Sequence, residues 1–284
     1  MRWMGRRQSD NIEDRRGASP SGKMVGGGIG TIVIALIFWL LGGNPNDILN
    51  VVQEQGGGQS TGSAYQATEQ EQALAEFVGV VLGDTEDVWN ELFRQGGGTY
   101  ELPKLVLFSG QVESACGLSS AASGPFYCPG DKRVYIDLSF CEQLQNQLNA
   151  PGDFAVAYVI AHEVGHHVQR LMGTTDQVHQ MRGRVSEKEY NQLSVRLELQ
   201  ADFFAGVWAH HAQRAKNILE EGDIEEALNA ASAVGDDTIQ KMTQGRVVPD
   251  AFTHGSSAQR KQWFYKGFKT GDVSQGDTFE DVNP

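Results

Sequence analysis

The chain has 284 residues, of which 40% are hydrophobic and 21% are charged, so it is too apolar for a disordered protein and too short for two large domains. Its net charge of -13 and its pI near 4.9 argue against a nucleic-acid binder that works by neutralising phosphates. The charge is uneven, because residues 1–23 hold six basic and three acidic residues, whereas the remainder holds 17 basic and 33 acidic ones. We therefore expect one main core with appendages, and a basic tip on an acidic body.

Residues 24–43 read MVGGGIGTIVIALIFWLLGG and carry no charge. A helix of this length rises about 30 Å, which matches the hydrocarbon core of a bilayer. A cleaved signal peptide would need a small-residue site after the apolar run, and GGNPND offers none, while a buried core helix fits poorly with the basic flank. The pattern predicts an uncleaved transmembrane anchor, with the signal peptide and the core helix as alternatives.

The basic residues before the anchor set the expected direction of insertion. Because basic flanks stay in the cytoplasm, residues 1–23 are expected to form a cytoplasmic basic tip. This predicts a single-pass protein of the bacterial inner (cytoplasmic) membrane, with its C-terminal domain exported to the periplasmic or extracellular side.

The segment after the anchor, residues 44–67, is rich in Asn, Gly, Ser and Gln and predicts a flexible linker. Thr68-x-x-Glu71 is a capping box that opens a helix, and a second short helix is expected over residues 85–94. Strand patterns and the irregular loop between them complete this half of the chain: strands at 104–109 and 134–138, and the loop at 111–133.

The C-terminal half is expected to be helical. An N-cap residue or a capping box indicates a helix start at four places: Asp153, Ser186, Asp223 and Ser256. Two or three strands with five or six helices predict a helix-rich α+β domain with a small sheet over residues 68–284.

The motif HEVGH at residues 162–166 points most clearly to a chemistry. In a helix, His162 and His166 share one face, so both imidazoles can bind one metal ion. Glu163 is one step round the helix, where it can take a proton from a metal-bound water without binding the metal itself. The motif predicts a hydrolase that holds one Zn²⁺ ion.

A catalytic zinc needs a third protein ligand and one open position. Glu198 is the best candidate, because a carboxylate in such an apolar stretch of helix is costly to bury unless it is paired or metal-bound. Asp202, one turn on, is expected to accept the other N–H of a ligating imidazole. The alternative for Glu198 is a surface carboxylate on an amphipathic helix.

Two other histidines are informative. His167 follows a ligand but faces away from it, so we expect it to be a packing or surface residue. His254 precedes a predicted helix start, where its side chain can point into a cleft and donate a hydrogen bond to an oxyanion. The alternative for His254 is a residue that only begins the helix.

Five segments together resemble the bacterial neutral zinc metallopeptidases: HEVGHHVQ, SVRLELQAD, GDIEEAL, PFYCPGDKRVYIDL and FTHGSSAQRKQWFYKGF. The resemblance covers about residues 70–280. It implies a zincin-like fold with a gluzincin ligand set, here His162, His166 and Glu198, and Glu163 as the general base.

The Thr253-His254 to Arg260 element also resembles that of the CaaX-processing and heat-shock membrane gluzincins. This resemblance implies that His254 stabilises the tetrahedral intermediate and that Arg260 assists it. The Glu198-to-Asp202 spacing is similar in those proteins too.

The cysteines depart from the family's pattern, which often has Cys where this chain has Phe203 and Gly276. Cys116 and Cys128 remain, and they are expected to form a disulfide in an oxidising compartment. Cys141 is then the odd thiol. A Cys nucleophile is a poor alternative for the chemistry, because nothing around Cys141 activates a thiolate.

These features predict a membrane-anchored zinc endopeptidase that acts on peptide or protein substrates and not on nucleic acid. The strand at 134–138 is expected to pair with an extended substrate. A catalytically silent, zinc-stabilised binding domain is the main alternative, and a metal-dependent hydrolase of a non-peptide substrate is the other.

Overall fold

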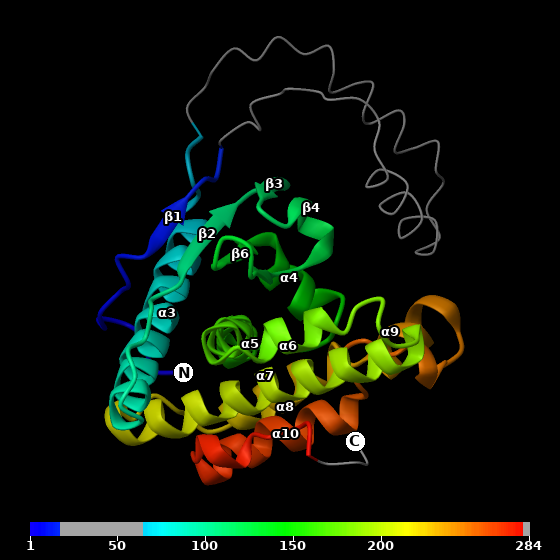
Figure 1. The fold of residues 1–284 in the computed structure, drawn as a ribbon. Helices are drawn as coiled ribbons and strands as arrows, with labels where there is room; N and C mark the ends of the chain where they lie inside the picture. The colour runs from blue at the N-terminus through cyan, green and yellow to red at the C-terminus, as the bar shows by residue number, and fades with distance from the viewer. Residues whose placement is uncertain (18–64, 281–284) are drawn as a thin grey trace, which may run out of the picture.

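The computed structural model describes residues 1–17 and 65–280, and these form a helix-rich α+β domain with a small sheet, as predicted (Figure 1). The strands are β1 (Ile12–Asp14), β2 (Lys104–Phe108), β3 (Gln111–Ser114), β4 (Gly117–Ser120), β5 (Phe126–Cys128) and β6 (Arg133–Asp137). The α-helices are α3 (Glu69–Gln95), α4 (Ser139–Asn146), α5 (Asp153–Met172), α6 (Thr174–Gln180), α7 (Glu187–Lys216), α8 (Asp223–Ala233), α9 (Asp236–Gln244) and α10 (Ser257–Thr270).

The main sheet has the strand order β1-β2-β6-β5. β1, β2 and β6 run parallel, β5 runs antiparallel to β6, and β3 and β4 form a separate hairpin. The prediction that the strand at 134–138 pairs with a substrate is therefore wrong, because β6 has a neighbour on both sides. β5 is the edge strand on that side of the sheet, and it lies within the segment that was expected to be an irregular loop.

α5 lies at the centre of the domain, with the sheet and α3 on one side and α7, α8 and α10 on the other (Figure 1). Its sequence explains this position, because residues 154–161 are apolar or aromatic on every face and all of them are buried. A helix that is hydrophobic all round is stable only when other elements cover it. The HEVGH motif follows directly in this buried helix.

The predicted helix starts are mostly confirmed. Capping boxes open three helices, with Thr68, Ser186 and Ser256 as the N-caps. Asp153 and Asp223 are the first residues of α5 and α8 and not their N-caps, because a glycine precedes each of them.

The two helices expected before residue 95 are one continuous helix, α3. Gly79 and Gly83 lie inside it and do not break it. A Cβ atom at Gly83 would lie 3.1 Å from the backbone oxygen of Arg7, and one at Gly79 would lie 3.3 Å from the Gln8 side chain. These glycines therefore let the N-terminal residues approach the helix closely.

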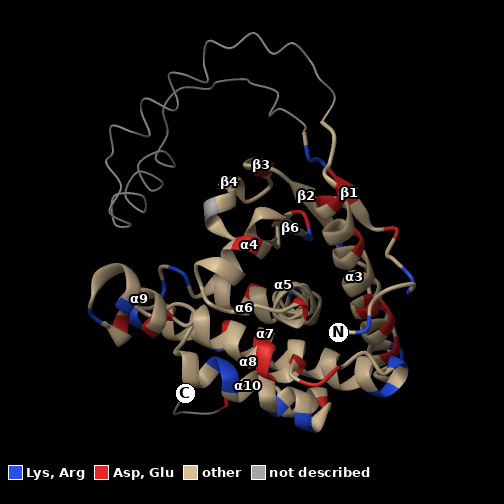
Figure 2. Ribbon diagram, turned by 180° about the vertical axis from the view of Figure 1, so that it is seen from behind, with Lys and Arg blue, Asp and Glu red and all other residues tan. Residues whose placement is uncertain are grey.

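Residues 1–17 belong to the same folded body as residues 65–280. Ile12 of β1 pairs with Leu105 of β2, and Arg6 Nη2 lies 2.6 Å from Asp84 Oδ1 of α3. Figure 2 shows basic residues of this segment beside the acidic residues of α3. The expected separation of a tip at 1–23 from a domain beginning at 68 is therefore corrected, because residues 1–17 supply an edge strand of the domain.

The Met1 amine connects the N-terminal segment to the starts of α5 and α8. It lies 2.9 Å from Asp153 Oδ1, 3.0 Å from Glu220 Oε2 and 3.3 Å from Asp223 Oδ1. Burial lowers the pKa of this amine, but the three carboxylates together raise it to about 10, so the amine stays charged at neutral pH.

Within the described ranges, the structure contains no helix with the length and hydropathy needed to cross a membrane. The anchor predicted at 24–43 and most of the linker predicted at 44–67 lie outside these ranges. Both stay predictions.

Candidate metal centre

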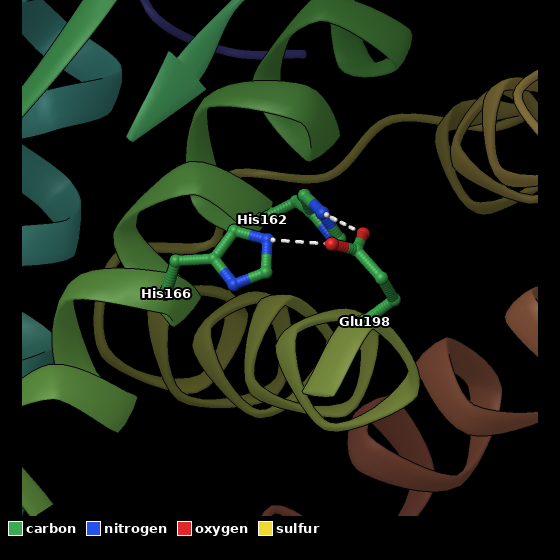
Figure 3. Close-up of side chains that lie close together, drawn as sticks. All are labelled: His162, His166 and Glu198. Carbon is green, nitrogen blue, oxygen red and sulfur yellow. Dashed lines mark hydrogen bonds and ion pairs between the residues drawn. The ribbon is translucent and has the colours of Figure 1, made fainter. Parts of the chain in front are cut away.

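The centre lies where α5 crosses α7. Gly165 is at the crossing, since a Cβ atom there would lie 2.9 Å from the backbone oxygen of Ala201. Only glycine allows this close approach, which brings Glu198 of α7 opposite His162 and His166 of α5 (Figure 3). One of the two variable positions of the HEVGH motif thus has a packing role.

The three predicted ligands converge on one point. His162 Nε2 lies 3.2 Å from Glu198 Oε2, and His166 Nε2 lies 3.4 Å from Glu198 Oε1. The ligand atoms of the three residues all lie within 4.8 Å of one another. Two imidazole nitrogens and a carboxylate are a ligand set that suits zinc and leaves a fourth position open, so the residues fit this ion.

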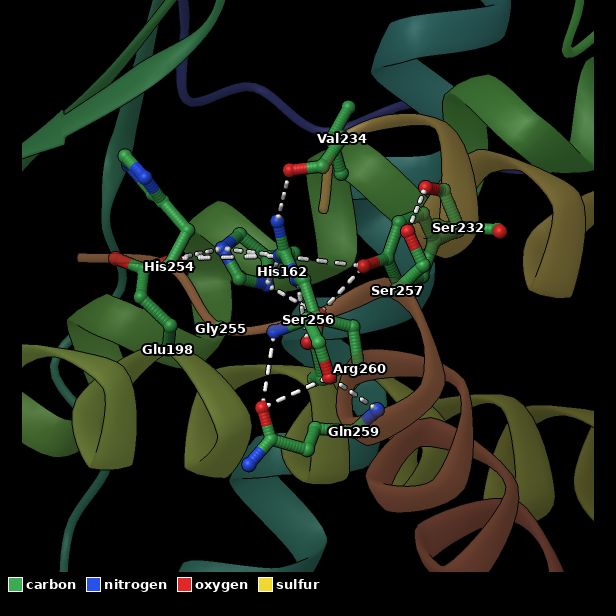
Figure 4. A network of polar contacts seen from close by, with 12 residues as sticks. His162, Glu198, Ser232, Val234, His254, Gly255, Ser256, Ser257, Gln259 and Arg260 are labelled. Atoms are coloured by element: carbon green, nitrogen blue, oxygen red, sulfur yellow. Dashed lines mark hydrogen bonds and ion pairs between the residues drawn. The ribbon is translucent and has the colours of Figure 1, made fainter. Parts of the chain in front are cut away.

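Charged side chains hold the Nδ1 side of the His162 ring. Its Nδ1 lies 2.8 Å from Asp202 Oδ1, and the Tyr158 hydroxyl donates to the same oxygen at 2.5 Å. Arg260 of α10 donates through Nε and Nη2 to the two oxygens of Asp202, at 2.8 and 2.9 Å. Figure 4 shows Arg260 extending from α10 toward His162 and the backbone of Val234.

These contacts set the protonation of His162 and Asp202. Burial by itself lowers the pKa of His162, but the charge of Asp202 and the hydrogen bonds to Asp202 and Glu198 raise it to about 9. Burial opposes ionisation of Asp202, and the Arg260 charge outweighs it, so the pKa of Asp202 is lowered. Asp202 therefore stays an acceptor for Nδ1–H and directs Nε2 of His162 toward Glu198, where a metal ion would replace the Nε2 proton.

His166 is held by an amide. Its Nδ1 lies 2.9 Å from Gln169 Oε1, and Gln169 is fully buried. Both histidines thus have a hydrogen-bond acceptor on Nδ1 and direct Nε2 at Glu198.

Glu163 is buried beside the ligands, and burial raises its pKa against the opposing charges of His162 and His166. It lines a cavity of about 470 Å³ together with the three ligands, His254 and Arg260. A carboxylate with a raised pKa at the wall of such a cavity is suited to proton transfer near neutral pH.

His254 lies at the rim of this cavity and its side chain is 54% exposed. Its Nδ1 lies 3.2 Å from Asp236 Oδ1. Asp236 Oδ2 also accepts three backbone N–H groups, from Thr253, His254 and Gly255, at 2.6 to 3.0 Å. Asp236 thus fixes both the loop and the imidazole.

β5 forms another wall of the cavity through Phe126 and Tyr127. Tyr127 donates its hydroxyl to Nδ1 of His167 at 3.0 Å, and His167 Nε2 donates to the backbone oxygen of Glu101 at 2.6 Å. His167 is fully buried and makes a packing contact between α5 and the sheet, which was one of its two predicted roles. Cys128, at the end of β5, forms a disulfide with Cys116.

Cys141 lies away from the centre. It lines a larger cavity between α3, α4 and α5, and burial raises the pKa of its thiol to about 12. It is therefore a thiol and not a thiolate at neutral pH, which argues against a Cys nucleophile.

The structure brings together the predicted residues of the centre: His162, Glu163, His166, Glu198, Asp202, His254 and Arg260. Sequence reasoning missed Tyr158, Gln169 and Asp236. Tyr158 is four residues before His162, and Gln169 is three residues after His166, so helical spacing places each beside its histidine. Nothing in the sequence around Asp236 indicates its role.

A family model described as "Putative neutral zinc metallopeptidase" matches residues 1–279. The chain belongs to this family. The match includes the N-terminal segment that pairs with β2, in line with its place in the fold.

Among similar proteins, the uncharacterized protein YpfJ of Escherichia coli (strain K12) is 48% identical over 285 residues, which cover 98% of this chain and 99% of that protein. The uncharacterized protein Rv2575 of Mycobacterium tuberculosis (strain ATCC 25618 / H37Rv) is 45% identical over 212 residues, covering 70% of this chain and 69% of that protein. No solved structure matches the chain.

Proposed function

We propose that the protein is a zinc-dependent endopeptidase with His162, His166 and Glu198 as the ligands and Glu163 as the general base. One observation carries the proposal: the three ligand side chains converge beside a buried carboxylate at the wall of one open cavity. Two histidines on one helix and a glutamate on a later helix are also the ligand set of the gluzincins, which the sequence resembles. We extend that likeness to a zincin-like fold.

The residues of the centre have separate roles in peptide hydrolysis. When bound, zinc supplies a Lewis acid that lowers the pKa of a coordinated water and polarises a carbonyl. Glu163 accepts a proton from the attacking water and passes it to the leaving amine. His254, positioned by Asp236, donates a hydrogen bond to the oxygen on which negative charge develops.

β5 supports a polypeptide as the substrate. It is an edge strand that pairs only with β6 among the described residues, and Phe126 and Tyr127 line the cavity that contains Glu163. An edge strand can bind an extended peptide through its backbone. We therefore place the substrate along β5 and not along β6.

The test is cleavage of a broad peptide pool by the wild type, Glu163→Gln and Glu187→Gln, with the zinc content of each measured. Glu187 is exposed in the first turn of α7 and serves as the matched control. We expect Glu163→Gln to bind zinc normally and to lower kcat by at least about 100-fold, while the control behaves as the wild type.

Two results would contradict the proposal. Cleavage by Glu163→Gln at close to the wild-type rate would remove Glu163 from the mechanism. Zinc bound by every variant with no cleavage by any of them would favour a catalytically silent binding domain.

A further inference from the structure

The amide that holds His166 continues into a chain of buried groups. Gln169 of α5 is fully buried, and Gln200 of α7 is 6% exposed. Gln169 Nε2 donates to the backbone oxygen of Leu197 at 2.7 Å and to Gln200 Oε1 at 3.1 Å. Gln200 Nε2 donates to the backbone oxygen of Gly276 at 2.8 Å.

The two backbone carbonyls fix the direction of this chain. A carbonyl oxygen can only accept, so Leu197 requires the NH₂ group of Gln169 on its side, and Gly276 requires the NH₂ group of Gln200. Gln169 Oε1 must then face His166. Since an amide oxygen cannot donate, Nδ1 of His166 must carry a proton, and in the neutral ring Nε2 then has the lone pair, on the side of Glu198.

Residues 276–279 are held to α7 at several points. The Thr278 hydroxyl donates to the backbone oxygen of Arg196 at 2.7 Å, and Arg196 Nη1 donates to the backbone oxygen of Phe279 at 2.9 Å. A Cβ atom at Gly276 would lie 2.6 Å from the Phe203 ring, so glycine permits this approach. These contacts keep the Gly276 carbonyl in place for Gln200.

We propose that Gln169, supported by Gln200 and Gly276, is the positioning residue of His166, setting its tautomer and ring orientation for zinc. The proposal rests on the zinc centre of the proposed function. The two histidine ligands then differ in what holds their Nδ1 atoms. The charged pair of Asp202 and Arg260 holds that of His162, and neutral amides hold that of His166.

The test measures zinc affinity of the full-length chain by competition with a chromophoric chelator, for the wild type, Gln169→Leu and Gln169→Glu. Both variants lose the bond to the Leu197 oxygen, so both are expected to be less stable. Only Gln169→Leu lacks an acceptor for His166. Loss of the group that hydrogen-bonds to a metal-ligating histidine weakens metal binding by about 10- to 100-fold. We expect this loss of affinity for Gln169→Leu only.

Gln213→Leu is the matched control. Gln213 lies near the C-terminal end of α7, is half-buried, and its side chain makes two hydrogen bonds, with Asn217 and Leu219. We expect wild-type zinc affinity for this variant. The absorption spectrum of the Co²⁺-substituted protein is expected to change for Gln169→Leu and not for the control, since it reports the geometry of the ligands.

The proposal is overturned if Gln169→Leu binds zinc as tightly as the wild type, or if Gln169→Leu and Gln169→Glu lose affinity equally, because a purely structural role predicts that. If Gln169→Leu does not fold, NMR of the wild-type histidine rings decides. A proton on Nδ1 of His166 supports the proposal and a proton on Nε2 alone overturns it. The NMR measurement does not require bound zinc. A wild type that binds no zinc would therefore contradict the proposed function, and the NMR test of the positioning residue would still apply.

Discussion

At the scale of single residues, each imidazole of the candidate centre has a hydrogen-bond acceptor beside its Nδ1 atom. Asp202 lies behind His162, Gln169 behind His166 and Asp236 behind His254. Asp202 of α7 and Asp236 of α9 are far in sequence from their histidines, so tertiary packing fixes those two imidazoles, whereas Gln169 lies on the same helix as His166.

Asp236 gives a prediction with a defined dependence on pH. Burial raises its pKa, but the His254 ring and the backbone N–H groups outweigh this, so the pKa lies below the ordinary value of 3.8. A carboxyl whose pKa is lowered in the folded state stabilises the fold above its unfolded pKa, and this contribution is lost as the pH falls through the folded value. We expect Asp236→Asn to lower the free energy of unfolding by about 1 to 3 kcal/mol at neutral pH and by less near pH 3.

Urea unfolding at several pH values checks this expectation. Asp250→Asn, at an exposed position, is the control. A stability difference between Asp236→Asn and the wild type that stays constant from neutral to acid pH would show that the charge of Asp236 has no such role.

The sequence predicts some residues of the centre better than others. His162, Glu163 and His166 follow from helical spacing alone, and Glu198 follows from the cost of a carboxylate in an apolar helix. Asp236 does not, because an aspartate in a polar-looking position gives no sign of what packs against it, and the spacing of Gln169 from His166 does not show that Gln169 is buried.

At the scale of elements, glycines set the distances between the helices. A Cβ atom at Gly206 of α7 would lie 2.1 Å from the backbone oxygen of Phe264, and one at Gly267 of α10 would lie 2.1 Å from that of Phe203. α7 and α10 therefore touch backbone to backbone. This contact keeps Arg260 within reach of Asp202, one turn before Gly206.

We expect Gly206→Ala to destabilise the fold by about 3 kcal/mol or more, because the backbone of α10 has to move. Gly79→Ala is the control, since the atom it would approach is the flexible end of the Gln8 side chain. Thermal unfolding of both variants checks this. Equal and small shifts in Tm for the two variants would contradict the close contact of α7 and α10.

The elements were predictable where the signal is local. The capping boxes at Thr68, Ser186 and Ser256 are local, and all three begin helices. The continuity of α3 and the edge position of β5 depend on the N-terminal segment and on strand pairing, which no local pattern shows.

At the scale of the whole molecule, the uneven charge of the chain has a structural role. Arg6 and Lys216 both pair with Asp84, whose side chain is only 2% exposed. The basic residues at the start of the chain thus complement acidic residues of the domain. Because β1 and β2 are neighbours in one sheet, residues 1–17 and 65–280 form one folded body.

Charge reversal tests this packing. We expect Arg6→Glu to destabilise the domain by about 3 kcal/mol, because it places a carboxylate beside the buried Asp84. The control is Arg94→Glu, whose partner Glu91 is on the surface, and a surface pair is worth at most about 1 kcal/mol. Urea unfolding of Arg6→Glu that matches the wild type would show that the pairing of Arg6 with Asp84 does not stabilise the domain.

The most direct test of the proposed zinc peptidase activity is a zinc titration of the metal-free, full-length chain, with the initial rate of cleavage of a mixed peptide pool as the readout. The convergence of His162, His166 and Glu198 predicts that cleavage is absent without metal and rises to its maximum at one equivalent of zinc. His162→Ala is expected to stay inactive under the same conditions. Cleavage that does not depend on zinc, or no cleavage at any zinc concentration, would contradict the account.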